Sequence, residues 1–205
     1  MNEEISASLS RTANARPISE ETQEIAWIHA SKCGDALSFN RLALKWERTM
    51  YNVALRMLQN PEEAADATQE VFLLAFKNVR NFKENSRFST WLYRIAVNHC
   101  ISRARQRPPG AHLSLDDETC GDIPAAQLHV AETQDVELIR AEQRNRVLAA
   151  LSHLTPEQRA VVELKFFEDM IFEDISEILG IPLSTVKSRL YAGLEMLKVR
   201  LSAGV

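Results

Sequence analysis

Turn-forming residues are scarce in this chain. Six glycines and seven prolines among 205 residues amount to about half of the usual share of roughly 12%. Many short strands joined by tight hairpins would need more of these residues. The composition therefore predicts an all-α fold.

Long apolar runs are missing as well. No stretch of the sequence approaches the roughly 18 residues that a membrane-spanning helix needs. The first 17 residues also lack the basic segment and the apolar segment of a secretory signal. We therefore expect a cytoplasmic protein that does not insert into a membrane.

Residues for catalysis or metal binding are sparse. Cys33, Cys100 and Cys120 form no C-x-x-C pair, and an odd count favours reduced thiols over a disulfide scaffold. Cys100 follows His99, but two adjacent helical residues point in different directions and cannot chelate one ion by themselves. There is no phosphate-binding glycine loop and no plausible catalytic triad. We expect no enzyme activity, no cofactor and no metal, and a redox role of the cysteines stays open.

Charge is distributed unevenly along the chain. The formal net charge is −4, yet residues 77–107 hold eight basic side chains and a single acidic one, Glu84. Residues 108–140 carry seven acidic side chains and one basic. The basic segment favours an anionic partner such as nucleic acid. A solvated helix surface is the alternative explanation.

Composition also divides the chain into two small helical domains. Residues 108–138 contain proline, glycine and an acidic cluster, and they lack helical periodicity, so they are predicted to form a flexible linker. The linker separates a domain at residues 29–107 from one at 139–205, and residues 1–28 are assigned to an N-terminal tail. Apolar periodicity and helix-start signals at Asn60-Pro61 and Thr155-Pro156 predict helices over residues 37–58, 61–79, 90–105, 142–151, 172–179 and 184–201, with a further helix beginning at Pro156.

The last two predicted helices form a helix-turn-helix signature. Gly180-Ile181-Pro182 stands between them, and a short turn containing Gly is typical of this motif. Val186, Leu190, Leu194, Leu197 and Leu201 form the apolar face of the final helix. Its start carries hydroxyl and cationic groups that could reach base edges and phosphates in a major groove. A trihelical unit without DNA function is the alternative.

Aromatic and cationic residues alternate between Phe82 and Arg105. This combination is typical of proteins that hold unstacked bases and the backbone of single-stranded nucleic acid. Part of the set must form core, so Trp91, Ile95 and Ile101 are expected to pack inward. The residues that would stay available for a base are Phe82, Asn85, Phe88 and Asn98.

Three segments in this order resemble the bacterial RNA polymerase sigma factors of the extracytoplasmic-function (ECF) group, which is group IV of the sigma-70 family. The segments are DATQEVF at 66–72, the aromatic and basic stretch at 82–98, and GIPLSTVKSRL at 180–190. The resemblance extends from residue 36 to residue 201. It implies a sigma region 2 helical bundle in the first domain and a region 4 helix-turn-helix in the second.

The resemblance also implies a function and a set of partners. Such a protein binds core RNA polymerase, through the β′ clamp helices and the β subunit, and directs promoter-specific initiation of transcription. Region 2 melts and reads the −10 element, region 4 reads the −35 element, and an anti-sigma factor is a probable further partner.

Site residues follow from the same resemblance. Polymerase docking is assigned to Asp66, Gln69, Glu70 and Phe72. Contacts to the −10 element are assigned to Phe82, Lys83, Asn85, Arg87, Phe88, Trp91, Arg94, Asn98 and Arg103. Contacts to the −35 element are assigned to Ser184, Thr185, Lys187, Ser188, Arg189 and Tyr191.

Two positions depart from the family pattern. Glu84 or Asn85 stands where the family commonly has Gly, which puts the backbone path of the loop in question. Ala192 stands where many relatives carry a long polar residue. The alternative function is a stand-alone helix-turn-helix regulator of the LuxR-like type, but such a protein needs an N-terminal receiver or ligand-binding domain, usually α/β, for which residues 36–107 show no pattern.

Overall fold

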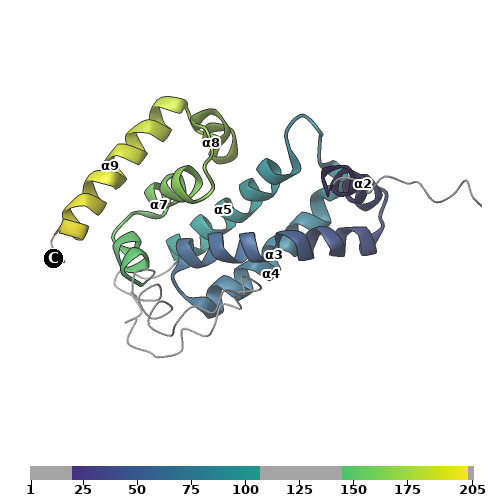
Figure 1. The fold of residues 1–205 in the computed structure, drawn as a ribbon, viewed down its shortest axis with the longest axis horizontal. Coiled ribbons are helices and arrows are strands. Elements are labelled where there is room, and N and C mark those ends of the chain that lie inside the picture. The colour runs from purple at the N-terminus through teal and green to yellow at the C-terminus, as the bar shows by residue number, and fades with distance from the viewer. Residues whose placement is uncertain (1–19, 107–144, 203–205) are drawn as a thin grey trace, which may run out of the picture.

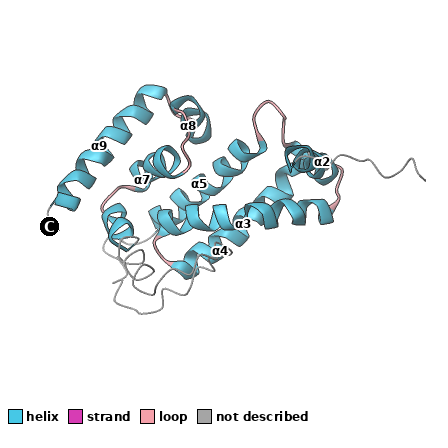
Figure 2. Ribbon diagram, in the orientation of Figure 1, coloured by secondary structure: helices cyan, strands magenta, loops and turns pink. Residues whose placement is uncertain are grey.

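The computed structural model describes residues 20–106 and 145–202, with side chains described as far as residue 200. Every regular element within these ranges is a helix (Figure 2), which confirms the predicted all-α fold. No helix in the same ranges is long and apolar enough to cross a membrane. The predicted linker lies outside the described residues.

The N-terminal group of helices contains α2 (Glu20–Lys32), α3 (Ala36–Leu58), α4 (Pro61–Asn78), the short 3₁₀ helix η2 (Val79–Asn81) and α5 (Phe88–Gln106). Helix α4 begins as its sequence predicts, because the Asn60 side chain accepts a hydrogen bond from the Glu63 amide at 2.9 Å and Pro61 occupies the first turn. Apolar faces of α3, α4 and α5 meet in one core that includes Leu42, Met50, Val71 and Leu92.

The C-terminal group starts with a helical segment at residues 145–152. It continues with α7 (Pro156–Val162), a π-helical turn η3 (Glu163–Phe167), α8 (Phe172–Leu179) and α9 (Leu183–Ser202). Thr155 and Gln158 form a reciprocal capping box at the start of α7. Fully buried Ile175 and Ile178 of α8 belong to the same core as Val186 and Leu190 of α9.

The boundaries of the predicted helices differ little from those observed. Among the described boundaries the largest shift is at α5, which begins two residues before the predicted start at Thr90; the predicted start at residue 142 lies outside the described residues. The assignment of residues 1–28 to a tail is wrong for residues 20–28, which belong to α2. Ile28 of α2 is buried in the core, and α2 contacts α3 and η2.

The two groups of helices are in contact. Helix α5 contacts both α7 and α8, and α3 contacts α7 and η3. Figure 1 shows α5 lying between helices α3 and α4 on one side and α7 and α8 on the other. This arrangement decides which surfaces of α5 remain open.

Candidate polymerase and nucleic-acid interfaces

One face of α4 is exposed and mixed in character. Asp66, Gln69 and Glu70 are all exposed and follow the three- and four-residue spacing that places side chains on one helix face. Leu73, at the next step along this face, is 58% exposed. Phe72, expected as the apolar anchor of this surface, is instead half-buried against the core. Leu73 is thus an exposed apolar side chain beside the three assigned polar residues, and its position seven residues after Asp66 on the same helix face is the sequence signal that could have found it.

Glu70 is also tied to α5. Its carboxylate lies 3.0 Å from His99 Nε2 and 3.4 Å from Arg103 Nη1. Burial lowers the pKa of His99, against the opposing effect of the Glu70 carboxylate. Arg103 thus points toward α4 and does not join the other cationic residues assigned to the −10 element.

Of the other cations assigned to the −10 element, Arg94 lies on α5 and belongs to a stripe along this helix. Trp91, Arg94 and Asn98 follow at steps of three and four, and Arg105 continues the same face two turns later. Arg94, Asn98 and Arg105 are exposed, and Trp91 is half-buried. We call these four residues the α5 stripe. It offers two cations, an amide and an aromatic ring in a row, which suits a nucleic-acid strand.

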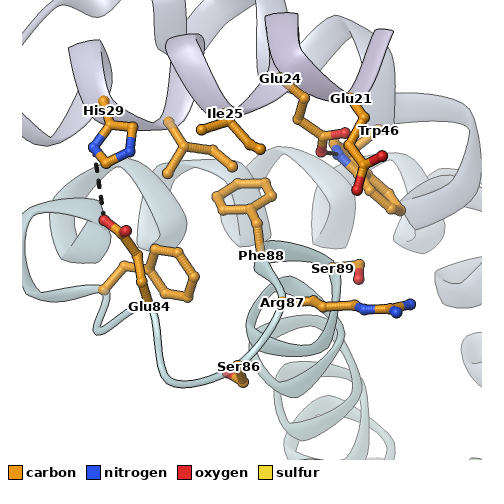
Figure 3. A pocket seen from close by; sticks show the side chains of 12 residues that line it. Glu21, Glu24, Ile25, His29, Trp46, Glu84, Ser86, Arg87, Phe88 and Ser89 are labelled. Atoms are coloured by element: carbon orange, nitrogen blue, oxygen red, sulfur yellow. Dashed lines mark hydrogen bonds and ion pairs between the residues drawn. The ribbon is translucent and has the colours of Figure 1, made fainter. Parts of the chain in front are cut away.

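The loop before α5 borders a cavity of about 420 Å³, a size typical of pockets that bind small ligands. Figure 3 shows α2 on one side of it, and on the other side Ser86 and Arg87 of the loop and Phe88 at the start of α5. Phe82, Phe88 and Trp91 form a packed aromatic cluster with ring centroids 5.2–5.8 Å apart.

Burial changes what these aromatics can do. Phe82 and Phe88 are only 4% and 6% exposed, so their faces are occupied by each other and by Trp91. We expected both rings to stay available for stacking on a base, but in the structure they are packed in the aromatic cluster. The rings still border the cavity, while Asn85 and Arg87 are exposed on the loop.

Glu84 fastens this loop to α2. Its carboxylate Oε1 accepts a hydrogen bond from Lys32 Nζ at 2.6 Å and lies 3.7 Å from His29 Nδ1 (Figure 3). The hydrogen bond from Lys32 lowers the pKa of Glu84. Gln59 and Asp169 are the non-glycine residues with positive φ in the described chain. Glu84 and Asn85 therefore follow the loop without needing a glycine conformation.

The helix-turn-helix has the geometry that its sequence predicts. Gly180 ends α8 with φ 64°, a left-handed conformation that favours glycine. Ser176 Oγ donates a hydrogen bond to the Ile181 carbonyl at 2.6 Å and closes the turn. Val186 and Leu190 of α9 are buried, and Leu194 and Leu197 are partly buried against them. The side chain of Leu201 lies outside the described residues.

The polar start of α9 is accessible. Ser184, Lys187 and Ser188 are exposed, and Tyr191 is 64% exposed. Thr185 and Arg189 are half-buried. Lys187 Nζ lies 5.6 Å from the centroid of the Phe172 ring, so its position is partly set by α8. The predicted residues therefore gather on one end of the helix.

Comparison with known proteins decides the family. The family profile described as Sigma-70 region 2 matches residues 42–108, and that of Sigma-70, region 4 matches residues 144–197. The ECF RNA polymerase sigma factor SigW of Bacillus subtilis is 33% identical over 176 residues, which cover 85% of this chain and 94% of that protein. The chain belongs to the ECF sigma factors. The RNA polymerase sigma-H factor of Pseudomonas aeruginosa, 32% identical over 86% of this chain and 91% of its own, is a second relative.

Solved structures share the fold of this sigma factor. CnrH, in complex with the cytosolic domain of CnrY, superposes with a TM-score of 0.65 at 18% identity, over 89% of this chain and 99% of its own. The sigma factor RpoE of Bartonella quintana, in complex with the anti-sigma factor NepR, gives a TM-score of 0.58 at 22% identity, over 80% and 96% of the two chains. The relatives establish a sigma factor that directs transcription, and a stand-alone regulator is not favoured.

The cysteines of this sigma factor lie in different environments. Cys100 is buried, and burial raises the pKa of its thiol to about 12. Cys33 is exposed, and Cys120 lies outside the described residues. Among the residues described, no group of three or more His, Cys, Asp or Glu side chains could hold a metal ion.

Proposed function

We propose that three surfaces of this sigma factor divide the work of initiation. The α4 face with Asp66, Gln69, Glu70 and Leu73 docks core RNA polymerase through its clamp helices. Its carboxylates and amide lie along the helix from the exposed Leu73, and an apolar anchor beside polar groups is what a protein interface requires.

The α5 stripe and the neighbouring loop contact the opened −10 element. The observation that carries this proposal is the alignment of Trp91, Arg94 and Asn98 on one face of α5. The first residues of the same helix line the loop cavity. Cations along this face would follow the phosphates of the non-template strand, and the cavity would accept an unstacked base. Lys83, Asn85 and Arg87 are exposed on the loop that precedes this helix.

The start of α9 enters the major groove of the −35 element. Lys187 and Arg189 supply cations, and Ser184, Thr185, Ser188 and Tyr191 supply hydroxyl groups for base edges or phosphates. The exposure of Lys187 and Tyr191 supports this assignment. Ala192 is exposed at the next position and adds no polar contact.

The remaining features of the proposal concern partners and setting. CnrH and RpoE were both solved with a bound protein, and we infer that an anti-sigma factor also restrains this sigma factor. We assign it to the cytoplasm, where core polymerase and promoters are found. We assign it no enzyme activity of its own, in line with its membership of the ECF sigma factors.

Run-off transcription tests the proposal as a whole. The full chain is mixed with bacterial core RNA polymerase and a library of promoter fragments. We expect initiation from a defined subset of fragments that core polymerase alone does not use. Tight binding of the free chain to duplex DNA, without binding to core polymerase, would instead indicate a stand-alone regulator.

Matched variants separate the three surfaces. Lys187→Ala should lower initiation at promoters that depend on the −35 element, by roughly 5- to 150-fold for a lost contact of about 1–3 kcal/mol. Arg200→Ala, an exposed cation at the far end of the same helix, is the control. Asp66→Ala should weaken the capture of core polymerase relative to Glu47→Ala on α3. Asn98→Ala should slow the opening of the −10 element without affecting capture.

A further inference from the structure

Helix α2 forms one wall of the loop cavity, and it is attached firmly to α3. The Glu24 carboxylate of α2 accepts a hydrogen bond from Trp46 Nε1 at 2.9 Å and another from Lys45 Nζ at 2.5 Å, both on α3. Ile28 of α2 is buried in the core, and α2 contacts both α3 and η2. The α2 wall of the cavity is therefore held in place by the packed bundle.

The opposite wall has little support from its own backbone. Residues 83–86 contain a local hydrogen bond from the Asn85 amide to the Lys83 carbonyl at 2.7 Å. No backbone hydrogen bond joins these four residues to another helix in the part of the chain that the structure describes. Phe82 and Phe88 hold the two ends of the segment in the aromatic cluster. The position of the loop between them must come from side-chain contacts, because its backbone is ordered by few bonds.

Two side chains of α2 supply such contacts, and both reach Glu84. Lys32 Nζ donates to Glu84 Oε1 at 2.6 Å, and His29 Nδ1 lies 3.7 Å from the same oxygen. Figure 3 shows His29 and Glu84 facing each other. The Lys32 side chain is only 26% exposed, and its ammonium group lies 6.0 Å from the centroid of the Phe82 ring. One lysine thus holds both the loop and the neighbouring ring against α2.

The charges around the cavity indicate how a DNA strand approaches it. Glu21 and Glu24 line the cavity from α2, whereas Arg87 lines it from the loop and Lys83 is exposed on the same loop. Phosphates are attracted by the two cations and repelled by the two carboxylates. The strand should therefore pass on the loop side, and the position of the loop decides where an unstacked base meets the cavity.

We propose that Lys32 is a positioning residue for the −10 element. By holding Glu84, it fixes the loop before DNA arrives, so the cavity is already formed when a base leaves the stack. Without this contact, part of the binding free energy is spent on ordering the loop. The proposal rests on the proposed role of the cavity in accepting an unstacked base. It extends the −10 surface to α2, which carries none of the residues assigned to that surface from the sequence.

A purely electrostatic role of the pair predicts a different result. Glu84 is an acidic group on a surface proposed to bind phosphates. If charge alone mattered, replacing Glu84 by glutamine or lysine should favour DNA and speed the opening of the −10 element. If Lys32 positions the loop through Glu84, the same replacements should slow opening. The sign of the change therefore distinguishes the two roles.

Stopped-flow fluorescence of 2-aminopurine in the −10 element of a promoter selected by run-off transcription measures opening by the complex with core polymerase. We expect Lys32→Ala and Glu84→Gln each to slow opening by roughly two- to fivefold, the range for one exposed ion pair. Glu84→Lys should also slow it, because two cations then face each other. Combining Lys32→Glu with Glu84→Lys restores the pair and should recover most of the rate. Glu47→Lys, the same change at an exposed site on α3, should not slow opening.

Two controls show whether the loss concerns the loop. Circular dichroism and the capture of core polymerase should stay unchanged in every variant, because Lys32 and Glu84 lie outside the α4 face. Faster opening in Glu84→Lys than in the charge-swapped double variant would overturn the positioning role. An unchanged opening rate in Lys32→Ala and Glu84→Gln would also overturn it.

Asn98→Ala separates this inference from the proposed function. If Asn98→Ala slows opening while the Lys32 and Glu84 variants do not, the −10 surface on α5 is supported and the positioning role of Lys32 is wrong. If none of these variants changes the rate of opening, the proposed −10 surface is itself wrong, and the positioning role is overturned with it.

Discussion

Replacing Arg159 by methionine should remove a large part of the stability of region 4. The Arg159 side chain is only 7% exposed. Its guanidinium donates to the carbonyl of Met57. It also donates to the carbonyls of Leu151 at 2.9 Å, Ser152 at 3.2 Å and Leu154 at 3.2 Å. These three carbonyls belong to the end of the 145–152 helix and the turn that follows it, so one side chain holds the turn before α7.

The expected loss is about 3–6 kcal/mol. A hydrogen bond to a charged group contributes roughly 1.5–3 kcal/mol, and a buried carbonyl left without a partner costs about 1–3 kcal/mol. The four contacts share one donor group and are not additive, so the sum is an upper bound. Methionine keeps most of the aliphatic stem, and the measured loss therefore reports the guanidinium. A loss of this size is a large fraction of the 5–15 kcal/mol that stabilises a typical domain.

Urea unfolding followed by far-UV circular dichroism measures this loss. Arg200→Met on α9 is the control, because Arg200 is exposed and its replacement should change the free energy of unfolding by less than about 0.5 kcal/mol. A loss below about 1 kcal/mol for Arg159→Met would refute the reasoning. It would mean that water replaces the guanidinium at little cost.

Three further predictions concern single groups. Cys33 should react with a thiol reagent in the native protein, whereas Cys100 should react only after unfolding because its thiol is buried with a pKa of about 12; equal rates would contradict this. Because burial lowers the pKa of His99, the unfolded state binds the extra proton first, and the free energy of unfolding should fall as pH drops below about 6.5. An NMR titration of the His99 ring should give a midpoint below pH ~6.5, and Glu70→Gln should lower this midpoint further, because the carboxylate favours the protonated ring. A midpoint at or above pH ~6.5 in the unchanged protein would contradict the effect of burial. Thr155→Ala should lower the free energy of unfolding by about 1 kcal/mol, because it removes the capping box at α7. Urea unfolding measures this loss, and an unchanged free energy of unfolding would contradict the prediction.

Local signals explain why the helices were predictable. Asn60 and Thr155 cap their helices through side-chain oxygens, and Gly180 takes the left-handed conformation that ends α8. Each of these interactions involves residues only a few positions apart, so the sequence alone predicts them. The spacing of Trp91, Arg94 and Asn98 likewise predicts a shared face once the segment is known to be helical.

Other features depend on neighbours that are distant in the chain. Arg103 follows His99 by one turn and so lies on another face of α5 than Arg94, but nothing in the sequence indicates that its partner is Glu70 on α4. Phe82 and Phe88 were expected to be free for a base, yet they pack on one another and on Trp91. No periodicity in the sequence reports which aromatic ring fills the core, because that depends on the space left by the other helices.

The sequence by itself determined the helical class, the two domains and the family of this sigma factor, since composition, helix caps and short motifs are properties of neighbouring residues. The tertiary structure decided the rest. The contact of Arg56 with Glu163 joins residues 107 positions apart, and such a pairing follows from the packing of α3 against η3 and not from any local pattern.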